Sequence, residues 1–298
     1  MLKYREQAYA SLASEDTSSA VEKDVFWKMT SPLLLNRRAH ELKNQSDSAY
    51  QELINQPPVN DFLRPALEQF RIASCCCPIN GKSRIRLAQL SIVGPDEFDE
   101  MEEIQTAARL APSDPAVLFR CGMLDIHAGR ESPGLAKLKK CLSISTEYLD
   151  DILAMVSGFV SRDQILEGAI PDSPERIMEI ARQVDDRVMR LRLADRAASM
   201  MQNFPLEKPT EKYLQASIAK MRSDTVVALE RYKAAVDLAP EKHAWRHEFV
   251  VLLTEQGMLS KAYTHASICV RQAPGIPAYR SLLKRINELR RLQKNGPR

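Results

Sequence analysis

The stretch AARLAPSDPAVLFRCG, residues 107–122, decides the fold, and a similar ending, AAVDLAPEKHAW, returns at residues 234–245. Both stretches close an apolar, helix-patterned run with Leu-Ala-Pro and then begin another run. Proline cannot continue a helix and restricts the residue before it, so a helix is expected to end at each of these prolines. The chain is therefore predicted to consist of repeated helical units.

The prolines that follow such runs are separated by one fixed interval. The step from Pro78 to Pro112 is 112 − 78 = 34, and the step from Pro240 to Pro274 is 274 − 240 = 34. A weaker copy of the pattern places Thr146 at the same interval after Pro112, since 146 − 112 = 34. This constant spacing indicates a repeated helical unit of that length. The small residue that comes shortly before each proline is Ala73, Ala107, Ala235 or Cys269.

Small and long side chains at positions i, i+4 and i+7 lie on one face of a helix, where the small ones let a neighbouring helix approach closely. The 34-residue period and this A-x3-F…P pattern resemble the tetratricopeptide repeat (TPR), a helix–turn–helix unit. The resemblance implies an all-α fold in which the units stack as a right-handed superhelix, because one unit cannot bury its apolar face alone.

Two further positions of the frame carry small residues. Ala88, Gly122 and Ala216 stand where the first helix of a unit is expected to cross the second helix. Gly129 and Gly257 fall at the expected turn between the two helices. The agreement of these positions across two separated blocks supports the repeat.

The frames divide the chain into five segments. Residues 1–46 are polar and then helical in pattern, and are predicted to form a partly flexible N-terminal helical cap. TPR-like repeats are predicted over residues 47–146 and 209–274. Residues 147–208 do not keep the period and are predicted to form an irregular helical insert, and residues 275–298 a basic C-terminal capping helix.

The charge is nearly balanced overall but uneven along the chain. The net charge is +3, and the part from Arg271 onward carries eight Lys/Arg against the single acid Glu288, or +7, so the rest carries −4. We interpret the basic end as a solubilising cap with cations near a helix C-terminus, with an anionic partner surface as the alternative. Nucleic-acid binding is not expected, because aromatic stacking residues are scarce there.

Targeting signals and membrane spans are not evident in the sequence. No run of about 18 apolar residues is found, and the N-terminal segment is too polar for a signal peptide, so we expect a soluble chain without direct membrane insertion. Six cysteines lack the spacing of a zinc site, and we expect them to be reduced and buried as small hydrophobic residues, with a redox triplet at residues 75–77 as the alternative. This favours a cytoplasmic location, with an extracytoplasmic one as the alternative.

Candidate chemistry is sparse, and neither enzyme activity nor a cofactor or metal is expected. His243 and His247 share one helix face, but HAWRHEF is not a zinc-protease motif, so we expect ordinary histidines that face solvent or line a groove. The acidic run PDEFDEMEE, residues 95–103, is interpreted as a solvated helix start, where carboxylates are favoured by the dipole. No glycine-rich phosphate loop or nucleophile motif is present in the sequence.

In TPR proteins the first helices of the units line the concave face, so the resemblance implies a groove there that binds a protein or peptide segment. Asn55, Lys82 and Arg86 fall where some TPR proteins hold a peptide's terminal carboxylate, but Gln51 replaces one expected cation, so a general mixed groove is favoured. The predicted protein-binding residues are Gln51, Asn55, Lys82, Ile85, Arg86, Gln89, Phe119, Met123, Tyr213, Ser217, His247 and Val251.

The sequence therefore predicts a non-catalytic scaffold for protein–protein interaction. A second hypothesis comes from segments such as CPINGKSRIRLAQLSIVG and ILEGAIPDSPERIMEIAR, which resemble bacterial TPR tails of O-antigen-ligase-like membrane proteins. That resemblance implies an accessory or detached component of a cell-surface polysaccharide system, associated with a membrane polysaccharide enzyme. Neither hypothesis names the partner.

Overall fold

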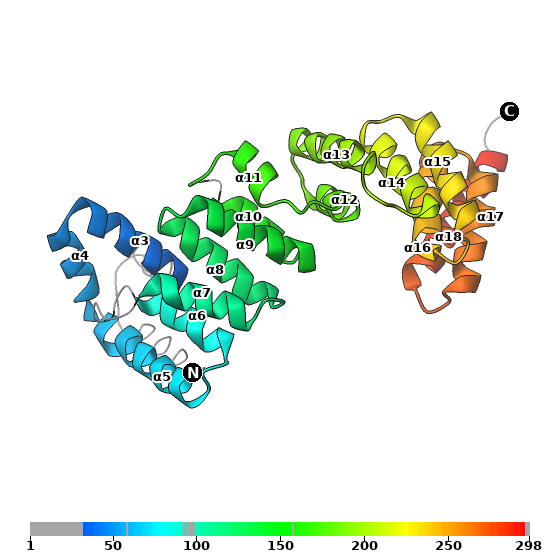
Figure 1. Cartoon of the computed structure of the whole chain (residues 1–298). Coiled ribbons are helices and arrows are strands. Elements are labelled where there is room, and N and C mark those ends of the chain that lie inside the picture. Colours follow the sequence, from blue (N-terminus) through cyan, green and yellow to red (C-terminus); the bar gives the residue numbers. More distant parts are fainter. Residues whose placement is uncertain (1–31, 58, 92–93, 95–98, 157, 296–298) are drawn as a thin grey trace. The chain divides into compact units, whose positions relative to one another are not determined.

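The computed structural model describes residues 32–57, 59–91, 94, 99–156 and 158–295. These residues form two compact units, one ending at Pro171 and the other beginning at Asp172 (Figure 1). The described residues contain helices and loops and no strand. The predicted all-α class is confirmed, and most of the cap predicted over residues 1–46 lies outside the described residues.

The first unit is a series of helices joined by short turns. Its hairpins are made by α6 with α7 and by α8 with α9, and α3 packs against α4, α6 and α8. The helices are α3 (Pro32–Gln45), α4 (Asp47–Ile54), the π-helix η1 (Val59–Leu63), α5 (Arg64–Cys76), α6 (Gly81–Leu90), α7 (Glu100–Leu110), α8 (Pro115–His127), α9 (Glu131–Ile144), α10 (Leu149–Val156) and α11 (Arg162–Gly168).

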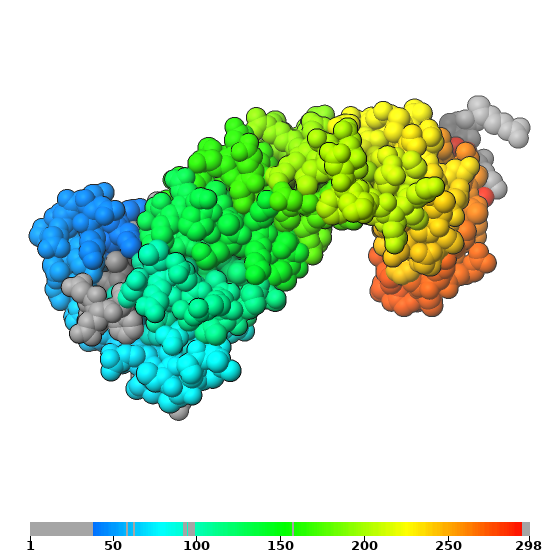
Figure 2. Space-filling model, in the orientation of Figure 1, coloured from blue at the N-terminus to red at the C-terminus, as the bar shows by residue number. Residues whose placement is uncertain are grey.

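The second unit repeats the hairpin three times and ends in a long single helix. α12 pairs with α13, α14 with α15 and α16 with α17, and α18 packs on α17. In the space-filling view the yellow and orange helices of this unit pack against one another (Figure 2). The helices are α12 (Pro174–Gln183), α13 (Arg187–Met201), α14 (Lys208–Met221), α15 (Thr225–Leu238), α16 (His243–Glu255), α17 (Leu259–Gln272) and α18 (Pro277–Asn295).

This succession of helical hairpins is a TPR-like fold. The predicted insert, residues 147–208, contains α10 to α13 and is divided between the two units. The five segments drawn from the sequence describe repeats rather than compact units, and their boundaries stay a prediction.

The Leu-Ala-Pro sequences end helices as predicted. α7 ends at Leu110, and the backbone N–H of Ala111 donates to the carbonyl of Ala107. Two residues after Pro112, the Asp114 side chain accepts hydrogen bonds from the first backbone N–H groups of α8. Proline thus stops one helix, and an aspartate N-cap starts the next. The sequence Leu238-Ala239-Pro240 ends α15 in the same way.

The turns inside the hairpins keep the period of the repeat. Gly129 lies between α8 and α9 with φ 76°, and Gly257 lies between α16 and α17 with φ 69°. Ser223 stands one period before Gly257 (257 − 223 = 34) and adopts φ 66° in the turn between α14 and α15. The turn therefore requires a residue in the left-handed conformation, with positive φ, even where the sequence does not supply glycine.

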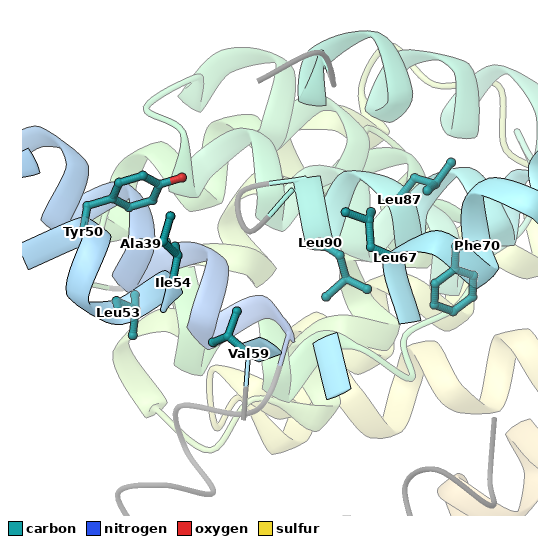
Figure 3. Packing of buried hydrophobic residues seen from close by; sticks show 9 residues of the cluster. All are labelled: Ala39, Tyr50, Leu53, Ile54, Val59, Leu67, Phe70, Leu87 and Leu90. Atoms are coloured by element: carbon teal, nitrogen blue, oxygen red, sulfur yellow. The ribbon is translucent and has the colours of Figure 1, made fainter. Parts of the chain in front are cut away.

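Each unit buries its own apolar side chains. Figure 3 shows nine buried residues of the first unit, contributed by α3, α4, η1, α5 and α6. α6 divides its apolar residues between two clusters, because Leu87 and Leu90 join this one while Ile85 and Ala88 pack with α7 and α8. A single helix thus links successive hairpins, as stacking requires.

Glycine permits the close crossing of α8 and α9. A Cβ atom on Gly122 would lie 2.8 Å from Leu138 Cδ2 and 2.9 Å from the carbonyl oxygen of Gly134. A Cβ on Gly134 would lie 2.8 Å from the carbonyl oxygen of Gly122. The two backbones therefore touch where the sequence placed the small crossing residue.

Gly122→Val is expected to lower the free energy of unfolding by about 1–3 kcal/mol, because the new side chain overpacks a contact with backbone. Urea denaturation followed by circular dichroism measures this change. Gly275→Ala is the control, since no atom lies within 4 Å of its added Cβ. Equal stability of the two variants would contradict the close crossing.

Candidate functional site

In the first unit, the predicted binding residues on α4 and α6 have partners within the chain. Gln51 and Asn55 are exposed, and Asn55 Nδ2 donates to the Gln51 carbonyl at 2.8 Å. The Lys82 ammonium is 3.2 Å from the Asp114 carboxylate. Arg86 Nη1 donates to Gln89 Oε1 at 2.8 Å, and Gln89 is buried. The structure does not show these side chains converging on one open pocket, so a carboxylate clamp stays a prediction.

The predicted residues on α8 lie inside the first unit. Every residue from Val117 to His127 is buried except the half-buried Arg120, since α3, α6, α7, α9 and α10 all pack against this helix. Phe119 stacks on Tyr148 with ring centroids 4.8 Å apart, and Met123 is fully buried. Because neighbouring helices cover α8 from several sides, it offers no open stripe to a partner.

In the second unit, α16 does present an open stripe. Ala244 and Glu255 are exposed, and His247 and Val251 between them are half-buried. Their spacing of three and four residues places them on one face of the helix. The opposite face, with Phe249, Leu252 and Leu253, is buried. The predicted residues His247 and Val251 are thus accessible, whereas the predicted Tyr213 and Ser217 on α14 are buried.

Tyr213 and Ser217 belong to a closed ring of polar contacts. Arg182 Nη2 donates to the Tyr213 hydroxyl at 2.8 Å and to Ser217 Oγ at 3.0 Å. Glu248 accepts hydrogen bonds from the Tyr213 hydroxyl at 2.7 Å and from the Tyr232 hydroxyl at 2.9 Å. Ser217 Oγ and the Tyr232 hydroxyl lie 3.3 Å apart and complete the ring. Three hydroxyls thereby connect one cation on α12 to one carboxylate on α16.

The electrostatics of this ring keep its phenols protonated. Burial, reinforced by the negative charge of Glu248, raises the pKa of Tyr213 and of Tyr232 well above the ordinary value. The phenols therefore remain hydrogen-bond donors to the carboxylate. This arrangement makes the ring a structural connection between α12, α14, α15 and α16 rather than a source of reactive oxygen.

A stack of rings lies beside the polar ring. Tyr213 and Trp245 are parallel within 10°, with centroids 4.5 Å apart. Arg182 Cζ lies 5.2 Å from the Tyr213 centroid, and Lys242 Nζ lies 5.8 Å from the Trp245 centroid. The aromatic pair is thus flanked by a cation at each end, which is a favourable arrangement for π faces.

Arg182, Trp245 and Glu248 were not among the predicted residues. Glu248 follows Tyr213 by one position more than the repeat period (248 − 213 = 35), so a frame-based search passes over it. Arg182 lies in the segment where the period is lost. The only sequence signal was the gathering of Tyr213, Tyr232 and Trp245 in a chain with few aromatic residues.

The histidines of the second unit make contacts of their own. His243 Nδ1 lies 2.8 Å from the Tyr279 hydroxyl, and the His247 ring is 5.0 Å from the Tyr279 ring. Arg246 is buried, with Nη1 3.3 Å from His265 Nδ1 and Nη2 donating to the Pro240 carbonyl at 3.0 Å. That carbonyl follows the C-terminus of α15, where a cation is favoured.

The cysteines divide into two groups. Cys121, Cys141 and Cys269 are buried, and burial raises the pKa of these thiols to about 12, about 12 and about 11. The prediction that all six are buried is wrong for residues 75–77, which are exposed at the C-terminal end of α5. In the described part of the chain, no group of three or more His, Cys, Asp or Glu side chains could hold a metal ion.

Within the residues placed by the structure, no helix combines the length and apolar character needed to span a bilayer. No protein-family model matches the chain, and no curated protein matches it.

Solved structures of TPR-repeat proteins are similar at low identity. The APC/C hetero-tetramer Cut9–Hcn1 has 8% identity and a TM-score of 0.39, covering 85% of this chain and 52% of that chain. Yeast Tom70 has 14% identity and a TM-score of 0.37, covering 95% and 66%. Acl4, an assembly chaperone of RpL4, has 14% identity and a TM-score of 0.33, covering 89% and 97%. The chain thus spans about half the length of the matched chain of the Cut9–Hcn1 structure and about two thirds of the length of the Tom70 chain.

Tyr232→Phe is expected to destabilise the protein by about 1–3 kcal/mol, because it leaves a half-buried carboxylate oxygen of Glu248 without its donor. Urea denaturation measures the change. Tyr263→Phe is the matched control, since the half-buried Tyr263 uses its ring for a contact with Arg290 and its backbone carbonyl for a bond from Ser267, and the substitution removes neither. Equal losses in the two variants would show that the ring does not stabilise the fold.

Stability is also expected to fall as the pH drops from about 7 to about 5.5. Burial and the nearby charge of Arg246 lower the pKa of His265, and burial lowers the pKa of His247. The unfolded chain then binds more protons than the folded chain below the ordinary histidine pKa of about 6.5, so acid favours unfolding. His265→Gln removes one titrating group and should flatten the dependence of the thermal midpoint on pH; an unchanged slope would contradict this assignment.

Proposed function

We propose that this protein is a non-catalytic scaffold that docks a segment of another protein against the open stripe of α16. The observation that supports this proposal most directly is the contrast between α8, which is covered on all sides, and α16, whose stripe from Ala244 to Glu255 is open. Ala244 and Glu255 are exposed and Val251 is half-buried, so the stripe remains accessible beside the contact of His247 with the Tyr279 ring. The first helices of TPR-like hairpins are also where the sequence predicted binding.

The chemistry of the stripe suits a protein segment. Ala244 and Val251 supply apolar contact, while His247, about one turn from each of them, and Glu255, about one turn after Val251, supply polar groups. Burial lowers the pKa of His247, so its imidazole is neutral at pH 7 and can both donate and accept a hydrogen bond. A mixed surface of small apolar and polar side chains is typical of peptide recognition by helical repeats.

The aromatic stack supports the stripe from one side. Trp245 is half-buried and fixed against Tyr213, and Glu248 is fixed by two phenols, so both side chains are held in one geometry before a partner arrives. Pre-organised side chains lose less entropy on binding than mobile ones. The polar ring of Arg182 therefore contributes to binding through positioning.

The polysaccharide-system hypothesis remains a proposal based on sequence resemblance alone. No feature of the described helices favours a glycan or a membrane enzyme as the partner. The membrane association, the cytoplasmic location and the bacterial origin stay predictions of the same kind.

Val251→Asp is expected to weaken docking strongly, because it places a charge in the middle of the stripe. The full-length protein is used to isolate partners by affinity purification, and each candidate is then titrated by calorimetry against the wild type and the variant. An unpaired buried charge typically costs enough to weaken binding by about a hundredfold. Val226→Asp is the matched control, since Val226 on α15 is 78% exposed and lies outside the stripe. A partner whose affinity is unchanged by Val251→Asp would overturn the proposal.

A further inference from the structure

One flank of α18 differs in chemistry from the equivalent flank of α16. By the 34-residue offset, positions 249, 250 and 253 of α16 correspond to positions 283, 284 and 287 of α18. In α16 the three residues are Phe249, Val250 and Leu253, all buried. This flank of α16 faces its hairpin partner α17, since Phe249 lies 5.0 Å from the His265 ring.

In α18 the same three positions carry Leu283, Lys284 and Asn287. Leu283 and Asn287 are half-buried and Lys284 is exposed. This flank borders an open hollow of about 420 Å³ whose lining residues all belong to α18. The hollow is lined by Arg280, Leu283, Lys284, Asn287, Glu288 and Arg291.

The charge of this hollow is strongly one-sided. Three of its lining residues, Arg280, Lys284 and Arg291, are cations, and Glu288 is the single acid. The three cations are exposed, and within the described part of the chain none of them forms an ion pair. An apolar helix of the α17 type would not suit such a flank, because it would desolvate these charges without compensating them.

We infer that this flank of α18 binds an acidic α-helix of a partner protein, in the way that α17 packs beside α16. The cations run along the helix from position 280 to position 291, a rise of about 16 Å, so they match a rod-shaped ligand rather than a single compact anion. Acidic residues on one face of a partner helix recur at the same helical spacing. Leu283 lies beside the cations of α18 and supplies an apolar contact for the partner helix.

A nucleic acid fits the same hollow less well. Glu288 stands within the row of cations, where it would face a phosphate backbone. The lining contains no aromatic side chain on which a base could stack. A partner helix can place a cation or a polar residue opposite Glu288, whereas a uniform polyanion cannot.

The test uses the full-length protein and a display library of helix-forming peptides with randomised surface positions. The probes are the enriched peptides, and their affinities are measured by fluorescence anisotropy at low and high salt. The inference expects enriched peptides with acids on one helical face, binding that weakens with salt, and a loss of about tenfold or more with Lys284→Glu and Arg291→Glu combined. The matched control is Arg285→Glu with Arg271→Glu, which makes the same change in net charge outside the hollow. Circular dichroism checks that both double variants fold.

The outcomes separate this inference from the proposed function. Peptides that lose affinity equally in both double variants would report non-specific attraction, and this would overturn the inference. Enriched peptides that are basic, or that bind in extended form, would overturn it as well. Binders that depend on Val251 but not on Lys284 or Arg291 would leave the proposed function standing and refute the acidic-helix site. The reverse dependence would support the site and count against the stripe.

Discussion

The close crossing of paired helices is the constraint on which the rest of the structure depends. Between α8 and α9 two glycines bring the backbones into contact, and a Cβ on either would lie within 3 Å of the other helix. One helix of a hairpin can also take part in two apolar clusters at once, as α6 does. Stacking continues from hairpin to hairpin, and the accessible surface of a first helix then depends on its neighbours: α8 is covered, whereas α16 keeps accessible residues.

The sequence predicts this part of the fold well because its causes are local. A helix stop at Leu-Ala-Pro, an N-cap at Asp114 and a left-handed turn at Gly257 each depend on a few neighbouring residues. The covering of α8 by α3 depends on contacts between segments far apart in the chain, and periodicity carries no information about it. Met123 therefore has the position of a groove residue in the repeat frame, yet it lies in the interior of the first unit.

Contacts between distant segments also limit how much of the candidate site can be predicted from the sequence. His247 and Val251 were predicted from the frame and are accessible, but the ring that supports them needs Arg182, a residue from the segment without a period. Only the fold brings that guanidinium to the hydroxyl groups of Tyr213 and Ser217. A fully satisfied polar ring fixes neighbouring helices relative to each other, so the irregular segment contributes to the site by holding the repeats in place.

Equivalent positions of α16 and α18 carry side chains of different chemistry. The helices are related by the 34-residue offset, and each presents an equivalent flank at residues 249–253 or 283–287. Where that flank is apolar, as with Phe249, the chain covers it with its own helix α17. Where the flank carries Lys284, packing against an apolar helix would remove water from the charge and would supply no hydrogen bond or opposite charge in its place. The same helical positions thus hold a folding contact in α16 and, in the site proposed above, charged side chains that suit an oppositely charged partner.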